Sequence, residues 1–364
     1  MVNELKRFLV GYERELYREI VNGFEFGFRL LCANPPTPGV ARNHLSAIQL
    51  PEQIEEFITK GLNLGRLAGP FSSPPLNNFV SSPLGVVPKA ESGKFRIIQD
   101  LSYPRGASVN SGIPHDASQV SYDTIDVVIN LVLKNGPGSL MAKTDIEDAF
   151  RIIPIHPCDY HLLGFSWNNK YYYDRCLPMG ASRSCSIFES FSTALVWIMR
   201  TKFNIPDISH ILDDFFFVGP KHSNLCQNAL TNFISLCNTL GVPIKDSKTV
   251  FPTTVIVIYG IEVDSVSMEC RLPMSKITKT ITKINQFLAR KKVTLRDMQS
   301  MVGLLNYACS VVLPGRAFLR RLINLLSLAK HPNHFIRLSR EVKDDLHVAR
   351  FSRILQRESP NSST

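Results

Sequence analysis

The hydrophobic residues of this chain recur at two spacings, which together predict a mixed fold of helices and strands. Recurrence every three to four residues is typical of helices with one buried face, and it runs through segments 4–31, 51–62, 122–134, 186–199, 225–240 and 277–288. Thr294, followed three residues later by Asp297, predicts a capped start for a further helix that runs through Leu305.

Short runs of β-branched and aromatic residues predict the strands. Segments 84–89 and 93–101 are expected to form a hairpin with basic residues on one edge, and segments 171–174 and 253–263 are expected to form further strands. The prolines of segment 151–157 favour extended chain over helix. The predicted class is therefore α+β.

Two adjacent carboxylates, Asp213 and Asp214, lie between short apolar runs, which predicts a strand, a tight turn and a second strand with the acids at the tip. Two neighbouring anions repel each other and make a poor turn, although a solvated surface turn also accounts for the pair taken alone. Asp145 follows another short apolar stretch upstream. Oxygen ligands held close together suit a hard cation such as magnesium, so we expect these three acids to converge.

Composition and charge narrow the class of protein. The chain has 364 residues, of which 44% are hydrophobic and 20% charged, as in globular proteins. No apolar run approaches the roughly 20 residues that span a bilayer, so we expect an intracellular protein, cytoplasmic or nuclear, without a membrane segment. The eight cysteines are scattered, without a Cys-x-x-Cys pair, which argues against a zinc site.

The positive charge is concentrated near the C-terminus. Residues 271–364 carry 18 lysines and arginines against 5 aspartates and glutamates, a balance of +13, whereas the whole chain carries +10, which leaves −3 for residues 1–270. A cationic region beside metal-binding acids suits a phosphodiester polymer, because cations neutralise backbone phosphates. Lysines and arginines that coat solvated helix faces would give the same charge balance.

The order of these signals resembles that of the reverse transcriptases, and most of all the polymerases of DIRS- and Ngaro-type retrotransposons. The resemblance covers about residues 45–325 and rests on segments 82–89, 100–104, 108–110, 149–151, 177–180, 211–214 and 314–319. It implies a right-hand polymerase fold, with fingers, a palm built of an antiparallel sheet with helices, and a helical thumb. The implied divisions are an N-terminal helical extension (1–75), fingers and palm (76–270), thumb-like basic helices (271–325), and a C-terminal tail (326–364) that begins a connection or a truncated ribonuclease H region.

The resemblance also implies roles for the acids. Asp145 and Asp213 match the main ligands of two magnesium ions, which manganese could replace, and Asp214 matches the acid beside them with a less direct role. Lys248 matches a candidate proton donor to the leaving pyrophosphate, and a solvated lysine is the alternative. Asp148 is expected to form a local hydrogen bond and to bind no metal.

Other residues match the sites for nucleotide and primer. Lys89 and Arg96 match finger residues that contact the incoming triphosphate, and Met179 with Gly180 matches the block that lines nucleotide and template. Phe150 matches the steric gate that excludes a ribose 2′-hydroxyl, although an ordinary core aromatic is the alternative. Tyr259 and Gly260 fall at the primer grip. Ile211 and Met179 depart from the family pattern, which usually has an aromatic residue at the first position and, in retroviral members, a polar residue at the second.

The function implied is RNA-directed DNA polymerisation, with a template–primer duplex of RNA or DNA and deoxynucleoside triphosphates as partners. Two alternatives stay open at this point: a catalytically inactive nucleic-acid-binding protein with a decayed polymerase fold, and a different magnesium-dependent phosphoryl transferase. The sequence predicts no oligomeric state.

Overall fold

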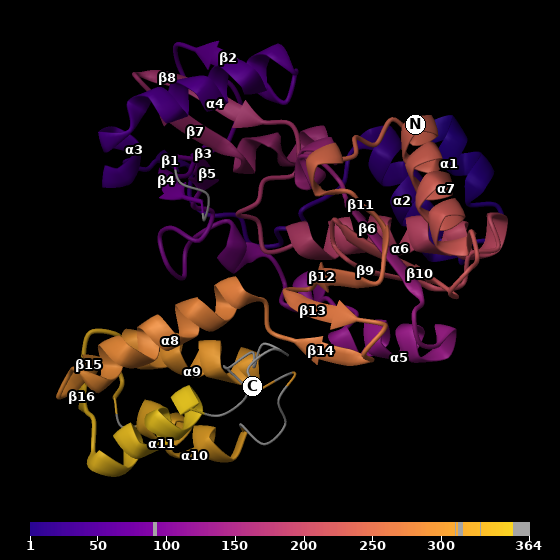
Figure 1. The fold of residues 1–364 in the computed structure, drawn as a ribbon. Helices are drawn as coiled ribbons and strands as arrows, with labels where there is room; N and C mark the ends of the chain where they lie inside the picture. Colours follow the sequence, from indigo (N-terminus) through magenta and orange to yellow (C-terminus); the bar gives the residue numbers. More distant parts are fainter. Residues whose placement is uncertain (90–92, 310, 312–315, 328, 352–364) are drawn as a thin grey trace, which may run out of the picture. The chain divides into compact units, whose positions relative to one another are not determined.

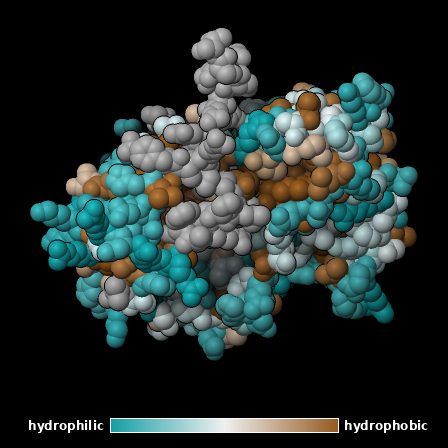
Figure 2. All heavy atoms as spheres, turned by 60° about the horizontal axis from the view of Figure 1, so that its bottom comes forward, coloured by the Kyte–Doolittle hydropathy of each residue, from teal (hydrophilic) through white to brown (hydrophobic). Residues whose placement is uncertain are grey.

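The structure is a computed structural model, described here for residues 1–89, 93–309, 311, 316–327 and 329–351 (Figure 1). The chain divides into two compact units. The first comprises Met1–Asn135 and Leu140–Thr253, and the second comprises Gly136–Ser139 and Thr254–Thr364. Within the described residues no helix is both long and apolar enough to cross a bilayer. Hydrophilic side chains cover much of the face shown in Figure 2, and hydrophobic ones gather in smaller patches.

A four-stranded antiparallel sheet lies at the centre of the first unit. Its strands, in spatial order, are β11 (Val250–Thr253), β6 (Leu140–Asp145), β10 (Asp214–Gly219) and β9 (Ile208–Ile211). Phe215, Phe216 and Phe217 are fully buried, so β10 is covered on both faces. The rings of Phe215 and Phe217 contact Phe233 of α7 (Leu225–Leu240) at centroid distances of 4.4 Å and 5.4 Å.

Three helices and the N-terminal segment complete this core. The helices packed around the sheet are α5 (Ile125–Asn135), α6 (Ser184–Lys202) and α7 (Leu225–Leu240), as their periodicity predicts. The N-terminal segment packs against α6 and α7, but residues 4–31 do not form one continuous helix, and that expectation is wrong. They form α1 (Val2–Phe8) and α2 (Arg14–Phe26), because the side chain of Glu13 caps a new start and Gly27, at φ 96°, ends the second helix.

A second sheet of five strands belongs to the same unit. Its spatial order is β1 (Gly39–Val40), β3 (Val80–Ser81), β7 (Gly164–Trp167), β8 (Lys170–Asp174) and β2 (Leu67–Phe71). Helices α3 (Leu45–Gln49) and α4 (Pro51–Asn63) pack beside it, with Ile54 and Ile58 in a shared core. The predicted basic hairpin is present as β4 (Leu84–Pro88) paired with β5 (Phe95–Gln99).

Five short 3₁₀ helices connect these elements within the described residues: η1 (Asn110–Gly112), η2 (Asp116–Ser118), η3 (Ala149–Ile152), η4 (Pro157–Leu162) and η5 (Asp246–Lys248). The expectation that segment 151–157 is extended throughout is therefore wrong. A proline restricts its own φ and the residue before it, so it excludes helix from Ile153 onward but not from Arg151 and Ile152. Pro157 itself suits the first turn of η4.

The second unit contains a three-stranded sheet and a helical subdomain. The sheet consists of β12 (Val255–Ile258), β13 (Ile261–Asp264) and β14 (Glu269–Arg271). The helices are α8 (Met274–Leu288), α9 (Leu295–Ala308), α10 (Arg316–Leu326) and α11 (Arg340–Phe351), with β15 (Lys292–Thr294) paired to β16 (Phe335–Arg337). The cap at Thr294 is confirmed, because its hydroxyl accepts a hydrogen bond from the Asp297 amide at 3.1 Å. Pro314, Gly315 and the tail from 352 onward lie outside the described residues.

Candidate active site

Asp145 and the adjacent pair Asp213 and Asp214, far apart in the sequence, meet at one end of the two middle strands of the central sheet. Asp145 ends β6 and lies directly opposite Asp214, the first residue of β10, in the antiparallel register. The backbone carbonyl of Asp213 accepts a hydrogen bond from the Ile146 amide at 3.1 Å. The prediction placed both neighbouring acids at the hairpin tip, but the turn residues are Leu212 and Asp213, and Asp214 is already in the strand.

The hairpin turn is held from helix α6 by contacts that the sequence did not reveal. Leu212 adopts a φ of 52°, which is unfavourable for a bulky residue. The carboxylate of Glu189 accepts a hydrogen bond from the Leu212 amide at 2.8 Å, and the Ser192 hydroxyl donates one to the Leu212 carbonyl at 2.8 Å. The other Glu189 oxygen lies 3.2 Å from Nε2 of His210. The signal that could have found Glu189 is a charged residue within an otherwise buried helix.

The acids repel one another electrostatically. Burial, together with the charges of Asp145 and Asp213 and a hydrogen bond with Asp145, raises the pKa of Asp214 to about 6. Burial and the charge of Asp145 also raise the pKa of Asp213. A carboxyl whose pKa is raised by neighbouring carboxylates gains from any cation placed among them.

Lys248, on η5, supplies one such cation. Its Nζ lies 2.5 Å from Oδ2 of Asp145, and the Asp145 side chain is only 4% exposed. Partial burial lowers the pKa of Lys248, but the hydrogen bond to Asp145 and the charges of the three aspartates outweigh that effect and raise it. The interpretation of Lys248 as a merely solvated lysine is therefore wrong, since its ammonium group is paired with an acid of the site.

The donor set suits a hard divalent cation. Asp145, Asp213 and Asp214 offer only carboxylate oxygens, which magnesium and manganese prefer. Across the described parts of the chain, no three His, Cys, Asp or Glu side chains already stand in metal-binding geometry. One oxygen of Asp145 is taken by Lys248, so a cation would have to share it with the ammonium group or displace that group.

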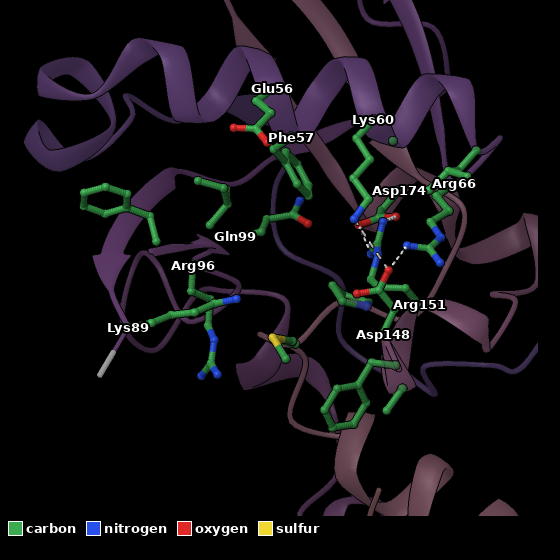
Figure 3. A pocket seen from close by; sticks show the side chains of 18 of the residues that line it. Glu56, Phe57, Lys60, Arg66, Lys89, Arg96, Gln99, Asp148, Arg151 and Asp174 are labelled. Carbon is green, nitrogen blue, oxygen red and sulfur yellow. Dashed lines mark hydrogen bonds and ion pairs between the residues drawn. The ribbon is translucent and has the colours of Figure 1, made fainter. Parts of the chain in front are cut away.

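Two of the three acids line a cavity of about 530 Å³ in the first unit (Figure 3). Asp145, Asp213 and Lys248 line it, whereas Asp214 is not among the lining residues. Lys89 and Arg96 of the β4–β5 hairpin line it as well, and Figure 3 shows them together on one side. Both basic side chains are exposed, and the cavity is therefore acidic where the sheet ends and basic beside the hairpin.

Met179 lines the same cavity, and Gly180 lies where the chain passes close to itself. Met179 is 54% exposed, as expected of a residue that could contact a ligand. A Cβ added to Gly180 would lie 2.2 Å from the carbonyl oxygen of Gln99, so only glycine fits against the end of β5. The side chain of Asn110 donates to the Gly180 carbonyl at 2.9 Å and accepts from the Ser182 amide at 2.8 Å. Asn110 thus fixes this loop, a role that the sequence did not reveal.

Phe150 is both a core residue and a lining residue. Its ring packs against Phe188 at a centroid distance of 5.4 Å, yet the residue is only partly buried and lines the cavity. The expectation of a local hydrogen bond for Asp148 is wrong. Its carboxylate accepts from Nη1 of Arg66 at 2.7 Å, across 82 positions of sequence, because the fold brings the start of β2 beside η3. Burial alone would raise the pKa of Asp148, but Arg66, Lys60 and Arg151 lower it.

Tyr259 and Gly260 form the turn between β12 and β13 in the second unit. Both have positive φ, 50° and 78°, as in the two-residue turns that suit hairpins. The Tyr307 hydroxyl on α9 donates to the Tyr259 carbonyl at 3.2 Å. A Cβ on Gly260 would lie 2.3 Å from that hydroxyl, so this turn is fitted closely to α9.

Comparison with known proteins places this geometry in a family. A family model described as "Reverse transcriptase (RNA-dependent DNA polymerase)" matches residues 87–301. Protein P of duck hepatitis B virus (strain China) is 30% identical over 142 residues, which are 38% of this chain and 18% of that protein. The Gag-Pro-Pol polyprotein of mouse mammary tumor virus (strain BR6) is 28% identical over 204 residues, 54% of this chain and 10% of the polyprotein. The chain thus spans less than a fifth of either relative.

Solved structures show the same fold. The foamy viral protease-reverse transcriptase dRH in complex with double-stranded DNA matches 96% of this chain and 60% of that chain, with a TM-score of 0.64 and 19% identity. The foamy viral enzyme in complex with an RNA/DNA hybrid matches 97% of this chain and 45% of that chain, with a TM-score of 0.64 and 18% identity. These likenesses confirm the predicted right-hand polymerase fold. Since the family model covers more than half of its residues, the chain belongs to the reverse transcriptase family of RNA-dependent DNA polymerases.

Proposed function

We propose that this chain extends a primer 3′-hydroxyl with deoxynucleotides along an RNA template by a two-metal mechanism. The observation that carries the proposal is the register of Asp145 opposite Asp214, with Asp213 in the adjoining turn and both Asp145 and Asp213 on the wall of the cavity. Lys89 and Arg96 give the same cavity the positive charge that a triphosphate requires.

The residues have distinct roles in this proposal. Asp145 and Asp213 hold two magnesium ions, and Asp214 adds negative charge beside them; manganese has the same oxygen preference. Bound metal supplies charge neutralisation for the phosphates and a lowered pKa for the attacking hydroxyl. Lys89 and Arg96 hold the triphosphate, Met179 and Gly180 line the nucleotide site, and Phe150 packs under the sugar. Tyr259 and Gly260 are the residues assigned to the primer grip.

Lys248 would serve the leaving group. Its raised pKa keeps Nζ protonated at neutral pH, and the side chain lines the cavity in which pyrophosphate would depart. An ammonium group that is freed from Asp145 can donate a hydrogen bond, and finally a proton, to a phosphate oxygen.

The origin of the chain is a finer part of the proposal. The segments at 82–89, 100–104 and 108–110 resemble the polymerases of DIRS- and Ngaro-type retrotransposons, and we infer that the chain derives from such an element. Two of the solved relatives are complexes, one with double-stranded DNA and one with an RNA/DNA hybrid. A template–primer duplex and deoxynucleoside triphosphates are the corresponding partners proposed for this chain.

Primer extension on poly-rA/oligo-dT with magnesium tests the proposal. The wild-type chain should incorporate dTTP, and Asp213→Asn should lower incorporation on the order of a hundredfold or more, because a metal ligand is lost. Asp116→Asn, at an exposed acid of η2 that does not line the cavity, is the matched control and should match the wild type. If the wild type and Asp213→Asn both fail to incorporate dTTP yet bind the duplex, the chain is an inactive nucleic-acid-binding protein and the proposal is wrong.

A further inference from the structure

The 3₁₀ turn that carries Phe150 is held at both ends by ion pairs. Before the turn, Asp148 accepts from Nη1 of Arg66 at 2.7 Å. Within the turn, Arg151 donates through both terminal nitrogens to the two carboxylate oxygens of Asp174, each at 2.6 Å. Figure 3 shows Arg66, Asp148, Arg151 and Asp174 gathered on one wall of the cavity.

Both partners come from the side of the five-stranded sheet where β2 pairs with β8. Arg66 directly precedes β2, whose first residue, Leu67, lies opposite Asp174 of β8 in the antiparallel register. The Arg66 carbonyl also accepts a hydrogen bond from the Arg175 amide at 2.9 Å. The sheet therefore supplies Arg66 as the partner of Asp148, and Asp174 as the partner of Arg151.

Asp148, at the start of the turn, combines an unusual backbone conformation with this ion pair. Asp148 adopts a φ of 52°, in the left-handed region, which residues other than glycine adopt infrequently. Such a conformation persists where surrounding contacts fix it. At the other end, Asp174 is 3% exposed and Arg151 16%, so that pair is part of the core. The Arg66–Asp148 pair is more accessible, with side chains 20% and 38% exposed, and it can be removed without burying a lone charge.

We propose that Arg66, through Asp148, is a positioning residue that fixes the Phe150 ring and thereby sets the discrimination between deoxyribonucleotides and ribonucleotides. The inference rests on the proposed polymerase function and on Phe150 lying under the sugar. Exclusion of a 2′-hydroxyl requires a ring that cannot retreat. Packing on Phe188 supports the ring from behind, while the ion pair stops the start of the turn from moving away from the cavity. A deoxyribose has no 2′-hydroxyl to meet the ring, so incorporation of a deoxynucleotide depends less on the contact between Arg66 and Asp148.

The test compares kcat/KM for dTTP and UTP on poly-rA/oligo-dT. In Arg66→Ala the dTTP/UTP ratio should fall on the order of tenfold, mainly through a gain with UTP, while kcat/KM for dTTP changes by less than about threefold. Arg66→Lys should restore part of the ratio, because it keeps one charged donor. Phe150→Val removes the proposed gate itself and should lower the dTTP/UTP ratio at least as far as Arg66→Ala does. Asp148 also lies 3.9 Å from Nζ of Lys60, so Asp148→Ala should lower the ratio at least as far as Arg66→Ala. The double variant should lower it no further than Asp148→Ala alone, because that change already removes the contact with Arg66.

Lys134→Ala is the matched control. It removes a lysine whose Nζ lies 2.5 Å from Asp207, also in the first unit but not among the lining residues of the cavity, and it should leave the ratio unchanged. Should Arg66→Ala not fold, Asp148→Asn removes the charge at nearly constant size and gives the same comparison.

Several outcomes would overturn the inference. A ratio that stays within about twofold of the wild type in Arg66→Ala would do so, as would a parallel loss with both nucleotides. An unchanged dTTP/UTP ratio in Phe150→Val would show that this ring does not discriminate between the two sugars. All these results presuppose dTTP incorporation by the wild type, whose absence instead overturns the proposed function and this inference with it.

Discussion

The ammonium nitrogen of Lys248 lies 2.5 Å from Oδ2 of Asp145, so a cation of the protein itself occupies part of the acidic site. The three aspartates cluster in a partly buried place, where their mutual repulsion is strong. Lys248 relieves part of that repulsion. A divalent cation that binds Asp145 must therefore compete with this ammonium group.

Replacement of Lys248 by methionine should strengthen divalent-metal binding and weaken catalysis. Removing the competing positive charge should tighten Mn²⁺ binding several-fold, to about tenfold, because one charge at this distance is worth on the order of 1 kcal/mol even in water. The same change should lower kcat for dTTP incorporation, since the proposed donor to pyrophosphate is lost. Calorimetric Mn²⁺ titration without nucleotide gives the affinity, with Lys221→Met, an exposed lysine that does not line the cavity, as control. Weaker Mn²⁺ binding in Lys248→Met would show that the lysine organises the acids instead.

The raised pKa of Asp214 should make metal-free stability depend on pH. The folded-state pKa is about 6, above the ordinary value of 3.8, so between these values the folded state binds more protons than the unfolded state. The contribution of this group to stability should therefore be full below about pH 3.8 and should be lost as the pH rises through about 6. Asp214→Asn should raise the Tm at pH 7.5 in EDTA and flatten this part of the profile.

Thermal unfolding between pH 4 and pH 8 measures the effect, and Asp116→Asn, at an exposed acid, serves as control. Excess magnesium should narrow the difference between the wild type and Asp214→Asn, because bound metal stabilises the wild-type acids. A lower Tm for Asp214→Asn in EDTA at pH 7.5 would contradict the repulsion argument.

The contact between Glu189 and the Leu212 amide should be necessary for activity. Glu189→Ala leaves a turn amide without its partner, which should cost about 1–3 kcal/mol of stability and loosen the residue before Asp213. We expect kcat to fall by at least about tenfold. Glu189→Gln keeps an acceptor oxygen and should retain most of kcat. Equal losses of kcat in Glu189→Ala and Glu189→Gln would indicate that the charge of Glu189, beside His210, matters more than its hydrogen bond to the Leu212 amide.

The fit of Gly260 against Tyr307 should limit substitution in the β12–β13 turn. Gly260→Ala places a Cβ 2.3 Å from the Tyr307 hydroxyl and adds a side chain at a φ of 78°, so it should destabilise the chain by about 1–3 kcal/mol. Adding Tyr307→Phe removes the clashing oxygen but not the backbone strain, and should recover part of the loss. Urea unfolding of both single variants and the double variant measures the coupling. Additive losses would contradict a direct clash.

The sequence by itself identified those features that depend on neighbouring residues. Periodicity located most of the helices, the β4–β5 hairpin and the capped start of α9, because helix faces and caps are set within a few positions of chain. The order of motifs singled out Asp145, Asp213 and Asp214, which the structure brings together at one end of strands β6 and β10. It also singled out Gly180, and the structure shows that a glycine is needed there because the backbone of Gln99 lies too close for a side chain.

Tertiary structure decided which distant partner each polar group would have. Asp148 pairs with Arg66 across 82 positions, and Glu189 reaches the Leu212 amide across 23. Nothing local distinguishes these partners, since a carboxylate can bond to any donor that the fold brings near it. Likewise, Lys248 pairs with Asp145 only because η5 follows a chain segment that folds back to the end of β6. Local sequence sets the backbone conformation and the buried faces of single elements, whereas long-range charge pairing depends on distances that exist only after the sheets and helices have packed.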